Sequence, residues 1–185
     1  LASNSTYSIQ GSVSRMRKIP NLDAILHVMG RYEHHKFAGT FSDEVQQRVL
    51  EPHQDFILLE QQGQDPRLVR AREMPYVART SHVVRAFVCD PVEGITTTAF
   101  HPVGPKATIE FSLDPRKLEF SDYKGDPVEV EVMPGARVVV PVTTRIFMRS
   151  EGISRGEMRM ALRRAKVTLI KPETIFVNAA LPVRL

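Results

Sequence analysis

Glu129 and Glu131 have the clearest chemical potential in this sequence, because they alternate with Val128, Val130 and Val132 in a short β-branched run. Residues i and i+2 of a β-strand point to the same face, so this pattern predicts two carboxylates side by side. Two like charges at this spacing suit acid–base catalysis or the stabilisation of a developing cation. The same pattern also fits a half-exposed edge strand with an acidic outer face, and both interpretations stay open.

Three consecutive threonines precede this pair, and strand alternation turns Thr97 away from Thr96 and Thr98. In a cleft, the Thr97 hydroxyl can orient a carboxylate, although threonine runs are also simply good strand formers. Arg15 follows a strand that we expect over residues 5–14. Its planar guanidinium matches the geometry of phosphate oxygens, whereas in isolation a surface arginine is the more ordinary interpretation.

In chain order, these pieces resemble the mono-ADP-ribosyltransferases of the arginine–serine–glutamate type, which have the fold of the cholera and pertussis toxins. That family carries an arginine on its first strand, then a Ser-Thr-Ser strand, then a Glu-x-Glu or Gln-x-Glu pair. The corresponding positions here are Arg15, residues 96–98, Glu129 and Glu131. The resemblance covers about residues 6–147.

The sequence departs from the family pattern in two ways. Threonine replaces serine in the central strand, which keeps the hydroxyl and adds a methyl group. The long separation between Arg15 and Thr97 implies an enlarged helical insert. Arg31 and Arg79 are alternative candidates for the arginine.

The resemblance implies an enzyme that transfers ADP-ribose from NAD⁺ to a side chain of a target protein and releases nicotinamide. Glu131 would stabilise the oxocarbenium-like ribose, Glu129 would serve the acceptor, and Thr97 would orient Glu131. No metal is implied. The acceptor would be a host-cell protein, with ubiquitin or a small GTPase as examples, and the chain would be a monomeric toxin or effector that is secreted or injected.

The resemblance also implies which residues bind NAD⁺ as co-substrate. These are Arg15, Thr97, Thr98 and Phe100, with Phe111 as the alternative aromatic that stacks on nicotinamide. No membrane or nucleic-acid partner is expected. We further expect that the chain, which begins with Leu1, is a trimmed fragment whose leader is not in the sequence.

Other residues with chemical potential have more ordinary interpretations. Two of the imidazoles of His27, His34 and His35 can share a helix face, but no cysteine completes a zinc set. Cys89 with His82 or His101 suggests a thiol nucleophile, although a cysteine among apolar strand residues is usually a core residue. A basic cluster follows later in the chain, at Arg155, Arg159, Arg163, Arg164 and Lys166.

Two other function classes compete with the transferase. A non-enzymatic, β-rich interaction or structural domain, such as a phage or secretion-system component, explains the strands without a catalytic site. An RNA-targeting toxin domain would use the basic cluster and the pI of about 9.4. The absence of a Gly-rich phosphate loop argues against a kinase, an NTPase or a Rossmann dehydrogenase.

The elements that must position these residues follow from periodicity. The 185 residues, with a net charge of +4 and one cysteine, favour a single domain without disulfides. We predict a helical region over about residues 20–73 and a strand-rich region over about 76–180. The fold class is therefore α+β, with helices on antiparallel sheets; the resemblance adds an NAD cleft between two packed sheets.

Helix boundaries are predicted from capping residues. Ser42 is expected to cap one helix, and Ser154 with Glu157 forms a capping box ahead of another. Pro52 should interrupt the helical region before residues 56–59.

Strands are predicted over residues 77–88, 95–100, 107–113, 128–133, 137–147, 166–170 and 175–177.

Overall fold

The structure is a computed structural model that describes residues 12–16, 18–19, 21–52, 54–60, 65–74, 77–78 and 83–170. Its helices are α1 (Val13–Met16), α2 (Leu22–Phe37), α3 (Asp43–Val49), the 3₁₀ helix η1 (Pro115–Lys117) and α4 (Arg155–Arg163). Its strands are β1 (Asp55–Leu59), β2 (Arg67–Glu73), β3 (Val84–Cys89), β4 (Ile95–Pro102), β5 (Ala107–Ser112), β6 (Leu118–Asp122), β7 (Glu131–Met133), β8 (Arg137–Val142), β9 (Ile146–Glu151) and β10 (Lys166–Leu169).

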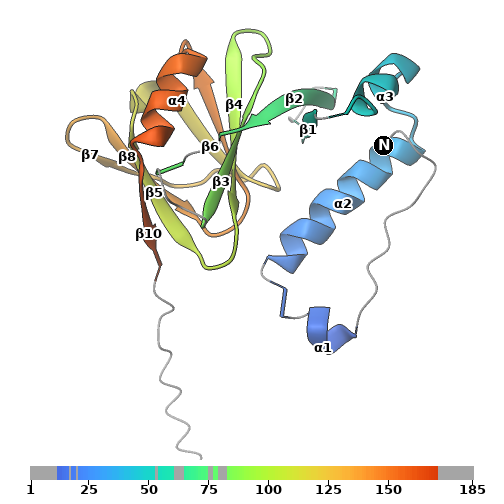
Figure 1. The fold of residues 1–185 in the computed structure, drawn as a ribbon, viewed down its shortest axis with the longest axis horizontal. Coiled ribbons are helices and arrows are strands. Elements are labelled where there is room, and N and C mark those ends of the chain that lie inside the picture. Colours follow the sequence, from blue (N-terminus) through green and yellow to red (C-terminus); the bar gives the residue numbers. More distant parts are fainter. Residues whose placement is uncertain are drawn as a thin grey trace, which may run out of the picture.

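The strands form two sheets, which confirms the α+β class with two antiparallel sheets. One has the order β1-β2-β3-β4-β9-β6 and the other the order β10-β5-β8-β7, and their strand pairs are antiparallel. In Figure 1, α4 lies over one end of the paired sheets, whereas α2 and α3 lie on the side of β1 and β2. No helix in the described ranges has the length and apolar character needed to cross a bilayer.

The main core lies between the two sheets. Alternation along β4 and β9 turns Phe100, Ile146 and Met148 inward, where they meet Ile109 and Val140 of the four-stranded sheet. All five side chains are 0–1% exposed. Met158 and Leu162 of α4 belong to the same cluster, so this helix covers the open end of the core.

The outer face of the six-stranded sheet carries a second apolar cluster. It comprises Ile57, Val69, Ala71, Cys89 and Ala99, which come from four adjacent strands. The larger sheet is therefore buried on both faces near its middle. Polar residues on its outer face lie beyond this second apolar cluster.

The capping box predicted for α4 is present. The Ser154 hydroxyl accepts from the Glu157 backbone N–H at 3.2 Å, and the Glu157 carboxylate accepts from the Ser154 backbone N–H at 2.8 Å. Ser42 likewise caps α3, as expected. These contacts satisfy backbone donors that a helix start leaves without intrahelical partners.

Ser154→Ala is expected to lower the free energy of unfolding by about 1 kcal/mol, because the Glu157 backbone N–H loses the hydroxyl acceptor that caps α4. Urea unfolding followed by circular dichroism measures the change. Ser112→Ala, at the exposed end of β5, is the matched control. Equal stability of the two variants would contradict a stabilising role for the cap.

Several element predictions are wrong. Residues 56–59 and 67–73 are strands β1 and β2 rather than parts of the helical region. They pair with each other, and short apolar runs do not distinguish a buried strand from a helix segment. Val13 and Ser14 lie in helix α1, not in a strand. The single strand predicted over 137–147 is two strands, β8 and β9, which lie in different sheets.

Some of the remaining strand predictions agree with the structure, and others do not. The strands at 95–100, 107–113 and 166–170 are present as β4, β5 and β10. Residues 77 and 78 form a turn, so the strand predicted from residue 77 begins later, as β3. The strand predicted over 175–177 lies outside the described residues. Strand β6 was not expected.

Candidate functional site

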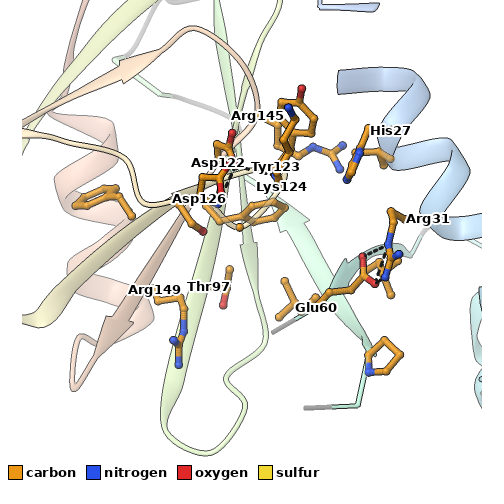
Figure 2. A pocket seen from close by; sticks show the side chains of 18 of the residues that line it. His27, Arg31, Glu60, Thr97, Asp122, Tyr123, Lys124, Asp126, Arg145 and Arg149 are labelled. Carbon is orange, nitrogen blue, oxygen red and sulfur yellow. Dashed lines mark hydrogen bonds and ion pairs between the residues drawn. The ribbon is translucent and has the colours of Figure 1, made fainter. Parts of the chain in front are cut away.

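A cleft of about 1150 Å³ opens on the outer face of the six-stranded sheet. Helix α2 forms one wall, and strands β4 and β9 with the turn after β6 form the others. Figure 2 shows His27 and Arg31 on the helix side, and Thr97 and Arg149 on the sheet side. The cleft is therefore assembled from segments far apart in the sequence.

Strand alternation explains why charged side chains face this cleft. In β9 and the residue before it, Ile146 and Met148 point into the core, so Arg145, Phe147 and Arg149 point outward and line the cleft. One short run of sequence therefore supplies two arginines to the same wall.

Helix α2 is attached to the sheet through Glu60, which follows β1. The Arg31 Nε donates to both carboxylate oxygens of Glu60 at 2.9 and 3.0 Å, and His35 Nε2 lies 2.7 Å from Oε1. The Arg31 hydrogen bond, more than that of His35, lowers the pKa of Glu60. In addition, the Leu58 backbone N–H donates to the Tyr32 hydroxyl at 2.9 Å.

A second contact spans the cleft nearer the turn. The rings of His27 and Tyr123 meet edge to face, with their centroids 5.2 Å apart. The Lys124 ammonium lies 5.7 Å from the centre of the Tyr123 ring. These contacts hold Tyr123 in the cleft wall, where Figure 2 shows it close to Asp122 and Asp126.

Arg149 is only partly satisfied by its neighbours. Its Nη1 donates to Glu119 Oε2 at 3.1 Å, whereas its Nε is buried with no hydrogen-bond partner in the described part of the chain. Thr97 lies directly opposite Arg149 in the β4–β9 register and is 6% exposed. Together they place a guanidinium donor and a hydroxyl at the floor of the cleft.

Arg145 is the most unusual charge in the cleft. Its Nη2 lies 3.3 Å from His101 Nδ1, and no described carboxylate forms an ion pair with it. Burial lowers the pKa of this guanidinium below its ordinary value. A cation withdrawn from water without an acidic neighbour is costly unless another group compensates it.

His101 stays neutral beside this arginine. Burial, followed by the positive charges of Arg145 and Arg85, lowers the pKa of His101 to about 3. Because Nδ1 accepts from Arg145, the ring proton belongs on Nε2, which is buried without a partner among the described residues. The ring also meets Phe87 edge to face at 5.1 Å.

Of the predicted site residues, the structure places only Thr97 in the cleft. As alternation predicted, Thr98 points the other way and is fully buried. Phe100 is also fully buried between the sheets, where its ring stacks on Phe111 at 6.1 Å. Neither aromatic ring can therefore stack on a ligand in this cleft, which corrects the predicted cofactor contact.

The predicted carboxylates, Glu129 and Glu131, and the predicted arginine, Arg15, lie outside the cleft. Glu131 begins β7, at the edge of the four-stranded sheet, and Glu129 precedes that strand. Both are exposed, and neither lines the cleft. Arg15 is exposed on helix α1 and does not line it either. The strand predicted around the pair is also shorter than expected, and its Val132 is 54% exposed.

The alternative residues also have defined places. Arg31 lines the cleft but is already paired with Glu60, and Arg79 lies outside the described residues. His35 is buried and contacts Thr40 as well as Glu60. Within the described ranges, no group of three or more His, Cys, Asp and Glu side chains is arranged to hold a metal ion.

The thiol alternative is not supported. Burial raises the pKa of Cys89 to about 12, which leaves almost no thiolate at neutral pH. His82 lies outside the described residues.

The sequence analysis missed Arg145, Arg149 and Tyr123. A signal for the two arginines was available, since Arg145, Phe147 and Arg149 alternate with apolar residues and must share one strand face. Tyr123 lies in a turn after a strand that was not predicted, so periodicity carried no signal for it.

No family model, curated protein or solved structure matches this chain.

Proposed function

We propose that this chain is a ligand-binding module that holds an anionic ligand in the cleft between helix α2 and the six-stranded sheet. The observation that carries the proposal is Arg145, a partly buried guanidinium that lines the cleft and has a neutral histidine as its hydrogen-bond partner. A bound carboxylate, sulfate or phosphate oxygen would supply the missing negative charge in the geometry that guanidinium prefers.

The other two arginines of the cleft already have acidic partners. Arg31 is held by Glu60, and the Nη1 of Arg149 is held by Glu119. Arg31 holds helix α2 against the sheet through Glu60, and Arg149 contributes to the floor of the cleft, while Arg145 anchors the ligand. This function is non-enzymatic, as is the β-rich interaction or structural domain that is the alternative to the transferase.

Transfer of ADP-ribose stays a prediction, supported in this structure by the position of Thr97 alone. The other residues that the resemblance assigns to NAD⁺ are not gathered around Thr97, because Phe100 and Thr98 are in the core and Arg15 is exposed on α1. These residues do not fit the dinucleotide, so we derive no catalytic step from it.

Arg145→Met is expected to weaken binding of the anionic ligand at least about tenfold, because a charge-assisted hydrogen bond is lost. The test is titration calorimetry of the full chain against uronic acids, inorganic phosphate, pyrophosphate, ADP-ribose and NAD⁺. The compound that binds best to the unmodified chain is then titrated into the variant.

Arg137→Met is the matched control, because Arg137 is paired with Glu110 on the four-stranded sheet and does not line the cleft. Unchanged affinity in Arg145→Met, or no binding of any anion, would contradict the proposal. Release of nicotinamide from NAD⁺ that is lost in Glu131→Gln would instead favour the transferase.

A further inference from the structure

We infer that the ligand of this cleft is a sugar that carries a carboxylate, such as a hexuronic acid unit of an acidic glycan. This inference rests on the proposed function and adds the chemical class of the ligand. Three features of the cleft support it: its charge balance, its mixture of hydrogen-bonding groups, and the aromatic ring in its wall.

The charge balance favours a ligand with a single negative charge. Arg31 and Arg149 are each paired with a glutamate, so Arg145 is the one guanidinium of the cleft without an acid in the described part of the chain. A diphosphate would bring at least two negative charges into a cleft that already holds several carboxylates. Lys124 also lines the cleft without an acidic partner in the described part of the chain, and Asp122 and Asp126 line it without a basic one. A ligand with one negative charge therefore adds less uncompensated charge to the cleft than a diphosphate does.

The hydrogen-bonding groups favour a ligand that also carries hydroxyl groups. The carboxylate of Asp126 lines the cleft, and no hydrogen bond in the described ranges engages it. Asp126 is exposed and its carboxylate can only accept hydrogen bonds, so a ligand group beside it is favoured when it carries a donor, as a hydroxyl does and an ionised phosphate oxygen does not. On the floor, the Nε of Arg149 lacks an acceptor, which the same hydroxyl groups can provide.

Asp122 differs from Asp126 and is not assigned to the ligand. Its Oδ1 accepts from the backbone N–H groups of Lys124 at 2.7 Å and Asp126 at 3.1 Å, so it fixes the turn. This turn carries Tyr123, whose ring contacts the His27 ring edge to face in the wall of the cleft. An aromatic ring beside a few polar groups suits a ligand that combines an apolar face with hydroxyl groups, as a pyranose ring does.

The first test is calorimetry of the full chain with oligogalacturonate, its neutral methyl ester, and ADP-ribose. We expect the acid to bind, and the ester to bind at least about tenfold more weakly, because it lacks the charge that Arg145 requires. ADP-ribose should bind more weakly than the acid. Glucuronate oligomers, which differ in one hydroxyl configuration, probe the same class.

Asp126→Ala separates a sugar from a phosphate ligand by the sign of its effect. For a uronate, the variant should bind about fivefold more weakly, since a hydroxyl loses a charged acceptor. For a phosphate ligand, the same variant should bind more tightly, since a nearby negative charge is removed. Asp114→Ala is the matched control, because Asp114 is an acid of the η1 cap that does not line the cleft.

The possible failures are distinguishable. Tight binding of ADP-ribose or pyrophosphate that depends on Arg145, without binding of uronates, would overturn the sugar inference and leave the anionic cleft intact. Binding of the neutral ester as tightly as the acid would overturn the role of the carboxylate. If no anion binds at all, both the inference and the proposed function are wrong.

Discussion

Phe100→Ala is expected to lower the free energy of unfolding by about 3–5 kcal/mol, the largest effect of any single change considered for this chain. Phe100 is fully buried and stacks on Phe111, so truncation removes apolar contacts from both sheets at once. A well-packed interior relaxes only partly around such a cavity.

Thermal and urea unfolding measure this loss. For a chain of this length, the expected shift in the midpoint temperature is about 10 °C. Phe37→Ala is the matched control, because Phe37 is 71% exposed at the end of α2, and it should change stability by less than about 0.5 kcal/mol.

The same variant bears on the role once predicted for Phe100. If Phe100 stacked on nicotinamide, it would be accessible, and its truncation would weaken ligand binding while leaving stability nearly unchanged. That result would contradict the packing described here.

Periodicity predicted the parts of the fold that follow from local pattern. The alternation of residues 95–100 predicted that Thr97 and Thr98 point to opposite faces of the strand. The structure confirms that Thr97 faces the cleft while Thr98 is buried on the core side. The caps at Ser42 and Ser154 were likewise readable, because capping depends on residues only a few positions apart.

Elements stabilised by long-range pairing were not predicted. Residues 56–59 carry a continuous apolar run that suits a helix or a buried strand equally well. Pairing with β2 stabilises the strand, and the apolar run itself does not indicate this partner. The division of 137–147 into two strands has the same cause, because β8 and β9 belong to different sheets.

The candidate site depends on tertiary contacts even more than the fold does. The two glutamates were singled out by their spacing, but their strand lies at the edge of the four-stranded sheet, and both are exposed. The unusual property of Arg145 is its environment: a neutral histidine from another strand is its partner, and no described acid is paired with it. No local pattern carries that information.

The neutral state of His101 predicts that stability falls as the pH is lowered from about 6.5 toward 3. The pKa of His101 is lowered from 6.5 to about 3 in the folded chain, mainly by burial. Below pH 6.5 the unfolded chain therefore takes up a proton that the folded chain does not. The resulting loss approaches about 1.4 kcal/mol per pH unit at most, and is complete near pH 3.

His101→Gln is expected to flatten this dependence, because glutamine does not titrate and can still accept a hydrogen bond from Arg145. The measurement is the free energy of unfolding between pH 6.5 and 4.5. Hydrogen bonds from Arg31 and Arg85 lower the pKa values of Glu60 and Glu73, and this contribution to the pH dependence is shared by the variant and the unmodified chain.

His34→Gln, which replaces an exposed histidine of α2, controls for the loss of a histidine as such. At pH 4.5 the unmodified chain should have lost up to about 2 kcal/mol more than His101→Gln, relative to pH 6.5. The same slope in both would show that His101 is protonated in the folded chain. It could then not accept from Arg145 through Nδ1, and the guanidinium would lose the neutral partner on which the anion-binding proposal depends.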